Sequence, residues 1–470
     1  MRVSLRRAAA TLAGKTAHQL SLRLNAGGGT TIPGVVARRL APNVLRELAG
    51  ALPDGAILVT GTNGKTTTAR MLSAILGAAG KRVLHNRAGA NLLSGLTATA
   101  VSGTDFWGRP QSDIAIFETD EAHVAGAIAE TRPRMVLVLN LFRDQLDRYG
   151  EVDTIARRWR AAFATLPSSS TVVLNADDPG VAGLGEELPC RVLYYGLEDL
   201  RHGVGAARHV ADSAFCRRCG APLDYTPAFY AHMGHYHCPN CGLTRPAPQV
   251  RLEHLDLRAT NPSLLHIATP KGDLNLQLPV PGLYNALNAL AAVAAALQLG
   301  VPPGTIKGAL EHFTAAFGRI ERFRAGSRDV LMALIKNPVG ASETIRMLTG
   351  DAGAGGANDL LHLLIVINDK TADGTDVSWL WDADFERLAG RVAHVVASGT
   401  RAWDMAVRLK YAGVETGRIE VVPELGEAVD RVLMSGDQEE TLYFLPTYTA
   451  MLELREELVA RGYLRPFWEN

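Results

Sequence analysis

The segment Val59–Thr68, which reads VTGTNGKTTT, constrains the fold of this chain more than any other. An apolar run at 56–59 precedes it, and apolar residues at helical spacing follow it at 71, 72, 75 and 76. A strand that turns through glycines into a helix points its backbone N–H groups at phosphate oxygens. The lysine then contacts the β and γ phosphates, and the hydroxyl after it reaches Mg²⁺. The segment therefore predicts an ATP site.

Every residue of this loop is a candidate nucleotide ligand: Gly61, Thr62, Asn63, Gly64, Lys65, Thr66 and Thr67. Lys65 is also a candidate catalytic residue, and Thr66 a candidate magnesium ligand. The general pattern G-x-x-x-x-G-K-[ST] is only half met, because its first glycine would fall at Val59. The alternative is an ordinary strand–turn–helix that contains G-K-T by chance. The order of the residues and both flanking elements argue against that alternative.

Composition limits the function classes. The length of 470 residues suggests about three domains, and 47% hydrophobic residues are enough for a large core. Lys plus Arg and Asp plus Glu both number 48, so no net positive field attracts nucleic acid. No run of about 18 apolar residues is present, so we expect no membrane-spanning helix and at most peripheral membrane contact.

The first 50 residues precede the nucleotide loop and form a predicted N-terminal helical segment. Basic residues before a short apolar patch resemble a signal peptide, but Lys15, His18 and Arg23 interrupt the patch. An amphipathic helix is the better interpretation, with Leu5, Leu12 and residues 18–22 on one face. We expect this face to pack on the protein body. Contact with an anionic membrane surface is the alternative.

Apolar strand candidates alternate with helical patterns in two series. The first has strands at 56–60, 82–85, 113–118, 135–140, 171–175 and 191–195, and the second at 329–335, 361–367, 392–398, 419–423 and 441–445. Such alternation predicts α/β domains with mostly parallel sheets. We expect a central ATP-binding domain at 51–320 and a smaller Rossmann-like domain at 321–470. The predicted hinge is 314–323, 351–359 is a predicted flexible loop, and ligands are expected in the cleft between the domains.

Four cysteines form two close pairs in an insert at about 212–245. Their spacing, Cys216-x₂-Cys219 and Cys238-x₂-Cys241, is that of a zinc ribbon, with Gly220 and Gly242 where each knuckle needs a positive φ. Four thiolates fill a tetrahedral site, so the predicted zinc is structural. The nearby histidines 232, 235 and 237 are alternative ligands that the site does not need. Cys190 is unpaired and reads as a small buried hydrophobe.

Several further segments resemble the Mur ligase superfamily. They are FETDEA (117–122), NLFRDQLDRYGE (140–151), LNADDP (174–179), GLYNALNALAAVAAA (282–296) and GRIERF (318–323), and the resemblance covers residues 50–325. It implies the central ATP-binding domain of that superfamily, with Glu118 holding Mg²⁺ as a catalytic group. It also implies that Asn285, Asn288 and Arg322 contact the nucleotide. For the two asparagines, capping of a helix N-terminus is the alternative.

Four departures separate this chain from the amino-acid-adding Mur ligases. It has Asp144–Gln145 where they carry Asp-His, and its segment 155–163 lacks their carbamylated lysine. Lys336 stands where they have a histidine, and their UDP-sugar domain has no counterpart. The chain is therefore not predicted to be a standard amino-acid-adding ligase.

Three other features resemble the MurT family, the synthetase subunits of lipid II isoglutaminyl synthase. They are GGGTTIPG (27–34), the Cys₄ insert, and the C-terminal segments 368–386 and 445–452. The resemblance implies ATP-dependent amidation of the D-glutamate α-carboxylate of lipid II through an acyl phosphate. It also implies a GatD-like class-I glutaminase partner that supplies ammonia. The place of action would be the cytoplasm, at the inner face of the membrane.

In that family the C-terminal domain docks the glutaminase and completes its Cys–His pair with an aspartate. The candidates here share one loop: Asp369, Asp373, Asp376 and Asp382. Asp373 and Asp376 rank highest, because they flank Gly374 in a turn and should be exposed. A solvated Asp-Gly turn is the alternative. The neighbouring Trp379 and Trp381 favour an interface.

Three rival functions stay open at this point. A folylpolyglutamate-synthetase-like ligase also has its nucleotide loop near residue 50 and lacks a UDP-sugar domain. A non-catalytic binding subunit would explain the altered motifs. A zinc-ribbon nucleic-acid module is disfavoured, because the chain has no net positive charge and no basic stripe.

Overall fold

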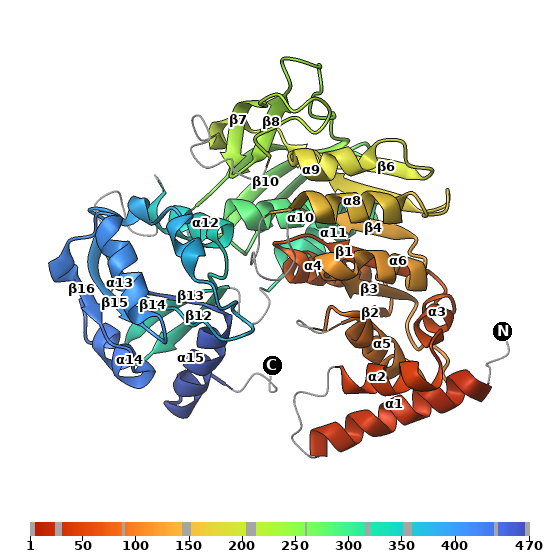
Figure 1. The fold of residues 1–470 in the computed structure, drawn as a ribbon, viewed down its shortest axis with the longest axis horizontal. Coiled ribbons are helices and arrows are strands. Elements are labelled where there is room, and N and C mark those ends of the chain that lie inside the picture. Colours follow the sequence, from red (N-terminus) through yellow and green to blue (C-terminus); the bar gives the residue numbers. More distant parts are fainter. Residues whose placement is uncertain are drawn as a thin grey trace.

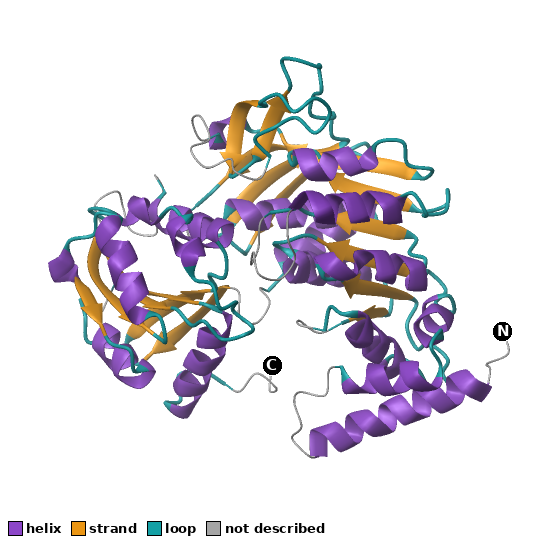
Figure 2. Ribbon diagram, in the orientation of Figure 1, coloured by secondary structure: helices purple, strands orange, loops and turns teal. Residues whose placement is uncertain are grey.

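The computed structural model describes residues 5–23, 31–86, 90–142, 152–203, 213–258, 261–314, 320–350, 360–436 and 440–465. Within these residues the chain forms a nine-stranded sheet, a six-stranded sheet and a two-stranded hairpin. Figure 1 shows the two large sheets as neighbouring bodies, with the N-terminal helices at one end of the larger body and the hairpin at the other. Figure 2 shows helices on both faces of each large sheet.

The nine-stranded sheet has the order β11-β10-β9-β6-β5-β4-β1-β3-β2. The strands are β1 (Ala56–Thr60), β2 (Val83–His85), β3 (Ile114–Glu118), β4 (Met135–Val138), β5 (Thr171–Asn175), β6 (Arg191–Leu197), β9 (Val250–Asp256), β10 (Ser263–Ala268) and β11 (Leu274–Leu278). In this order, every neighbouring pair from β9–β6 to β3–β2 is parallel, whereas β9–β10 and β10–β11 are antiparallel. The central strand β1 lies between β3 and β4, so the loop that follows it opens at the carboxyl edge of the sheet.

Helices cover both faces of this sheet. They are α4 (Lys65–Ala78), α5 (Leu93–Ser102), α6 (Val124–Thr131), α8 (Val152–Phe163), α9 (Pro179–Ala182), α10 (Leu283–Gln298) and α11 (Pro303–Glu311). Ile57 and Val59 pack with α4, α10 and α11, and Ala56 and Leu58 pack with α6 and α8. Burial on both faces explains why β1 is an unbroken apolar run. The small alanines of α10 let this helix lie fully inside the protein.

The N-terminal helices are α1 (Leu5–Arg23), α2 (Ile32–Leu40) and α3 (Val44–Ala49). The predicted buried face of α1 is wrong, since Leu5 is 90% exposed and Leu12 is 51% exposed. Arg7 and Ala10 are buried instead, and a Cβ at Gly14 would lie 3.1 Å from the Pro33 carbonyl. Small residues allow α1 to approach α2 closely, and this close contact decides the orientation that apolar spacing failed to predict.

The Cys₄ insert forms the hairpin β7 (Asp224–Tyr230) and β8 (Met233–His237), which pair antiparallel. Short 3₁₀ helices are η1 (Glu121–His123), η2 (Gly183–Gly185), η3 (Leu200–His202), η4 (Ser378–Trp381), η5 (Phe385–Leu388) and η6 (Thr416–Arg418).

The six-stranded sheet has the order β12-β13-β17-β14-β15-β16. Its strands are β12 (Ile320–Ala325), β13 (Arg328–Ala333), β14 (Leu361–Val366), β15 (Val392–Ser398), β16 (Ile419–Val421) and β17 (Leu442–Pro446), and its helices are α12 (Pro338–Thr349), α13 (Ala402–Tyr411), α14 (Leu425–Leu433) and α15 (Tyr448–Ala460). Only the edge pair β12–β13 is antiparallel in this sheet.

The predicted α/β fold with two mainly parallel sheets is confirmed, and each predicted strand has a counterpart at nearly the same residues. The structure adds β9–β11 and β12, which the sequence did not predict. The predicted hinge overlaps β12 at 320–323, while 315–319 and the predicted loop 351–359 lie outside the described residues. In the part of the chain that the structure describes, no helix has the length and apolar character needed to span a membrane.

Candidate functional site

The loop between β1 and α4 has the strand–turn–helix form that the sequence predicted. Helix α4 begins at Lys65, and Gly64 caps it with a φ of +86°. A Cβ at Gly64 would lie 2.1 Å from Oδ1 of Asn288, and a Cβ at Gly61 would lie 3.0 Å from the backbone N of Asn140. Gly64 needs both its positive φ and this close approach, so no other residue fits. The first N–H groups of an α-helix have no partner within the helix, so a helix start of this kind can bind an anion.

Lys65 is buried beside a carboxylate that the sequence analysis missed. Its Nζ donates to the Thr62 carbonyl at 3.2 Å and lies 3.1 and 3.2 Å from the two carboxylate oxygens of Glu121. Trp159 Nε1 donates to the Glu121 carbonyl at 2.8 Å and fixes that residue. Glu121 is the second glutamate of the FETDEA motif, so the motif that pointed to Glu118 also contains this residue. The pair keeps a cation at the predicted phosphate position.

Thr66 and Glu118, the predicted magnesium ligands, lie together. Thr66 Oγ1 donates to Glu118 Oε1 at 2.9 Å, and Glu118 ends the strand that pairs with β1. Asn86 Oδ1 accepts from the Glu118 backbone N at 2.8 Å and fixes its position. The other carboxylate oxygen, Oε2, is buried and has no hydrogen-bond partner among the described residues. A hydroxyl and a carboxylate with a free oxygen fit the oxygen ligands that Mg²⁺ prefers.

The segment after β4 forms hydrogen bonds with the nucleotide loop. The Asn63 backbone N donates to Asn140 Oδ1 at 2.8 Å, and Asn140 Nδ2 donates to the Asn63 carbonyl at 3.0 Å. One residue earlier in the loop, Thr62 Oγ1 accepts from the Phe142 backbone N at 3.0 Å. Asn140 opens the NLFRDQLDRYGE segment, yet nothing in the sequence assigns it this contact. Residues 143–151, which include Asp144–Gln145, lie outside the described residues.

A pocket of about 90 Å³ lies beside this loop, between the two large sheets. Predicted nucleotide ligands line it: Asn63, Gly64, Thr67, Asn285 and Asn288. The second sheet contributes Lys336 and residues of α12. Asn337 Nδ2 also donates to Asn63 Oδ1 at 2.9 Å, so both bodies contact the loop directly.

Helix α10 brings both predicted asparagines to the pocket. Asn285 Nδ2 donates to the Pro281 carbonyl at 2.7 Å, and Asn288 Oδ1 accepts from Thr68 Oγ1 at 3.3 Å. The N-cap of α10 is Gly282, so neither asparagine caps the helix and that alternative is wrong. Arg322 lies exposed on β12 and is not among the described residues that line the pocket. Its nucleotide contact stays a prediction.

Glu343 of α12 is a second pocket residue that the sequence analysis missed. It is buried, and burial raises the pKa of this carboxyl to about 6. The positive charges of Arg346 and Arg387 lower the pKa of Glu343 and so oppose the effect of burial. Arg346 Nη1 lies 3.8 Å from the Glu343 Oε1. Because nothing in the sequence around Glu343 marks it, only the packing of α12 against the first sheet identifies it.

The aspartate loop after β14 differs from the prediction at one position. Asp373 is only 4% exposed, so its expected exposure is wrong. It accepts hydrogen bonds from the backbone N of Thr449, at 2.8 Å, and from the Thr449 hydroxyl, and so ties the loop to α15. Asp376 is exposed and accepts from the Ser378 backbone N at 2.8 Å. Asp382 is also exposed, and Asp369 pairs with Arg401 at 2.9 Å.

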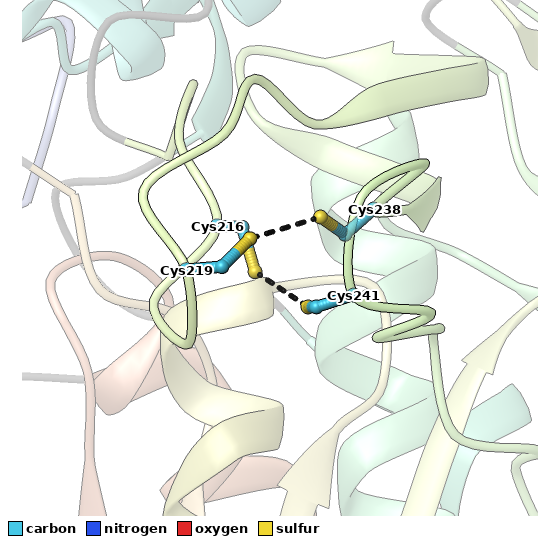
Figure 3. A group of neighbouring side chains, drawn as sticks. All are labelled: Cys216, Cys219, Cys238 and Cys241. Carbon is cyan, nitrogen blue, oxygen red and sulfur yellow. Dashed lines mark hydrogen bonds between the residues drawn. The ribbon is translucent and has the colours of Figure 1, made fainter.

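The four cysteines converge as predicted, from two facing loops (Figure 3). Their sulfur atoms all lie within 4.8 Å of one another, with Cys216–Cys241 and Cys219–Cys238 at 3.5 Å. A zinc ion with Zn–S bonds of about 2.3 Å requires sulfur separations of about 3.8 Å, so this set fits zinc. The knuckle glycines 220 and 242 have φ of +73° and +71°.

None of the three nearby histidines belongs to this cluster within the described residues. His235 contacts the Leu197 carbonyl at 2.8 Å, and His232 contacts Asp178 at 3.2 Å. Cys190 is buried in the core of the nine-stranded sheet, as predicted.

Comparison with known proteins identifies the family. Residues 59–219 match the Mur ligase middle domain, and residues 334–451 match the MurT ligase C-terminal model. The lipid II isoglutaminyl synthase (glutamine-hydrolyzing) subunit MurT of Streptococcus pneumoniae (strain ATCC BAA-255 / R6) is 35% identical over 456 residues, 97% of each chain. The chain belongs to the MurT family.

Solved structures agree with this fold. A pseudomurein peptide ligase type C from Methanothermus fervidus has a TM-score of 0.66 at 21% identity, covering 89% of this chain and 81% of that chain. The folylpolyglutamate synthase of Mycobacterium tuberculosis, complexed with ADP and AMPPCP, has a TM-score of 0.61 at 15% identity, covering 96% and 99%. The likeness to both is one of fold, whereas the likeness to MurT is one of sequence over nearly the whole chain.

We expect Lys65→Met to abolish ATP turnover, because the nucleotide loop then loses the cation that neutralises charge on the phosphates. The same change leaves the Glu121 carboxylate buried without its cation, which should cost about 3 kcal/mol of unfolding free energy. Adding Glu121→Gln should restore most of the stability but none of the turnover. Denaturant unfolding and ADP release measure the two effects. Turnover by the stable double variant would remove Lys65 from the mechanism.

Proposed function

We propose that this chain is the synthetase subunit that amidates the D-glutamate α-carboxylate of the lipid II stem peptide to D-isoglutamine. One observation carries the proposal. A relative named for this activity is 35% identical over 97% of each chain. The geometry around Lys65, Thr66 and Glu118 supports the nucleotide half of the reaction.

The proposed reaction couples ATP cleavage to amide formation. The carboxylate attacks the γ-phosphorus of ATP, so that an acyl phosphate forms and ADP leaves. Ammonia then attacks the acyl carbon, phosphate leaves, and a proton is lost to give the carboxamide. Lys65 neutralises charge on the transferred group, and Thr66 and Glu118 would hold Mg²⁺, which offsets the phosphate charge. The amine here is ammonia, so the site needs no pocket for an amino-acid side chain.

The ammonia would come from a GatD-like class-I glutaminase, in keeping with "glutamine-hydrolyzing" and "subunit" in the relative's name. A surface for such a partner lies on α13, where Trp403, Val407 and Tyr411 form one exposed stripe at helical spacing. The ring of Trp381, from the aspartate loop, lies 5.8 Å from that of Tyr411. The guanidinium carbon of buried Arg408 lies 5.4 Å from the centroid of the Trp381 ring, so Arg408 packs against this ring. Clustered exposed aromatic residues are typical of protein interfaces.

A lipid-linked substrate would place this protein in the cytoplasm, at the inner face of the membrane. The end of the molecule formed by α1 fits such a peripheral contact. Leu5, Leu12 and Leu20 of α1 are exposed there, and so are Phe106 and Trp107 of the loop after α5. Lys15 lies 5.5 Å from the Phe106 ring, so cationic and aromatic groups adjoin, as they do at membrane interfaces.

The deciding experiment is mass spectrometry of lipid II after incubation with this protein, ATP, Mg²⁺ and ammonium chloride, without any glutaminase. We expect the D-glutamate carboxyl to become a carboxamide, with one ADP released per amide. Unchanged lipid II in the presence of bound ATP would favour the non-catalytic subunit. Glutamate-dependent ADP release would favour a folylpolyglutamate-synthetase-like ligase.

The buried state of Asp373 changes which aspartate we propose for the partner's Cys–His pair. Asp376→Asn should lower glutamine-driven amidation at least about tenfold and leave ammonium-driven amidation unchanged, because only the glutaminase would lose a group. Asp382→Asn tests the other exposed candidate of the loop and should leave amidation with either nitrogen source unchanged. Asp373→Asn should lower stability, since Thr449 loses a charged acceptor. Equal loss with both nitrogen sources would contradict the role of Asp376.

Trp403→Glu should weaken binding of the glutaminase at least about thirtyfold, the effect of removing a central aromatic anchor. Trp107→Glu is the matched control, because Trp107 and Trp403 are both 68% exposed and Trp107 lies far from α13 in the chain. Calorimetric titration of the full chain with the partner measures both variants. Wild-type affinity of Trp403→Glu would place the partner elsewhere.

A further inference from the structure

The hairpin of the Cys₄ insert contains two different parts. At its base, Cys216 and Cys238 pack with Leu223, Tyr236 and Leu243, and with Ala182 of α9, in a small apolar cluster separate from the main core. At its tip, the side chains belong to the main core of the nine-stranded sheet: Phe229, Tyr230 and Met233. The tip is therefore built into the ATP-binding body, whereas the base holds the metal-binding loops.

The tip lies against the segment that supports the nucleotide loop. The Phe142 ring centroid is 4.7 Å from that of His232 and 6.0 Å from that of Tyr230. Phe142 in turn donates its backbone N–H to Thr62 of the nucleotide loop. Tyr230 also lines the pocket of about 90 Å³ itself. A shift of the tip would therefore move both the pocket wall and the support of the loop.

A buried carboxylate connects His232 to the same segment. His232 is 1% exposed, and its Nε2 lies 3.2 Å from Oδ2 of Asp178. That oxygen accepts a hydrogen bond from the Leu141 backbone N at 2.8 Å, and Oδ1 accepts from the backbone N of Val181 at 3.1 Å. Through its contact with His232, Asp178 thus links the hairpin tip to the residue just before Phe142.

The tip also contacts the second body. Arg346 of α12 donates to the Phe229 carbonyl at 2.7 Å and to the His202 carbonyl at 3.0 Å. The same helix brings Glu343 to the pocket. The hairpin tip therefore meets both walls of the nucleotide pocket.

We propose that Tyr230 and His232 are positioning residues of the nucleotide site, and that metal bound by the four cysteines raises nucleotide affinity through this hairpin. A two-stranded hairpin is only marginally stable in water, and its pairing here is interrupted by register shifts. A metal ion bound by the four cysteines joins the two loops at the hairpin base and so stabilises the hairpin. The insert then has a role beyond its own loops, and this role requires nucleotide binding alone, not the amidation reaction.

The first test uses the zinc-loaded full chain titrated with ADP and Mg²⁺ in a calorimeter. Tyr230→Ala and His232→Ala should each weaken ADP binding about tenfold, the size of coupling usual between contacting groups. Their metal content should match that of the wild type. Tyr230→Phe should keep wild-type affinity, because it retains the ring. His237→Ala is the control at the hairpin base, where that side chain is half exposed.

The second test removes the metal, by chelation of the wild type and by Cys219→Ser. ADP affinity should fall as in the tip variants, and hydrogen exchange should increase at 229–233 and at 61–64 together. Wild-type ADP affinity in the tip variants, or in metal-free protein that still unfolds cooperatively, would overturn the proposal. Neither measurement contains lipid II or ammonia, so a failure of the proposed amidation would leave both results interpretable.

Discussion

The close approach of α10 to the nucleotide loop is the constraint on which the rest of the site depends. Gly64 lies so near Asn288 that any side chain at position 64 would overlap it. This distance is possible because α10 is built largely of alanine and lies buried within the core. With the loop held against α10, Lys65 contacts Glu121 and Thr66 contacts Glu118 at the start of α4. The alanine content of a helix far along the chain thus sets the geometry of a loop near residue 64.

Three asparagines from different parts of the chain hold that loop. Asn288 of α10 lies against Gly64, Asn140 contacts the loop from the segment after β4, and Asn337 contacts it from the N-cap of α12 in the second body. Each is buried, and an amide can donate and accept at once, so Asn140 alone satisfies both the N–H and the carbonyl of Asn63. Because Asn337 belongs to the second body and contacts Asn63, a change in the relative position of the two bodies would alter this contact with the loop.

Strands and local motifs could be predicted from the sequence, whereas contacts between distant segments could not. Strand β1, the nucleotide loop and the Cys₄ cluster follow from local pattern, because each depends on residues close in sequence or on fixed spacing. Glu118 was predicted only through the resemblance to the Mur ligases, and its hydrogen bond with Thr66 joins residues 52 apart in the chain. Glu121, Glu343 and the hairpin tip were missed, because their roles come from contacts between segments that lie far apart in the chain. The wrong face of α1 and the burial of Asp373 have the same cause. In both, a tertiary contact overrode a local preference, through Gly14 in α1 and through Thr449 beside the aspartate loop.

The departures from the amino-acid-adding Mur ligases are consistent with this architecture. Lys336 lines the pocket from the second body where those ligases carry a histidine, so a cation is retained on that wall. Ammonia has no carboxylate or side chain to recognise, and a site that accepts it can lose specificity contacts and still keep its phosphate-binding parts. Such a site must instead exclude water and receive ammonia from a fixed direction. A partner docked on α13 and the neighbouring aspartate loop would bind to the second body, which contributes one wall of the pocket. Lys336, one of the departures from the amino-acid-adding enzymes, lies on that wall.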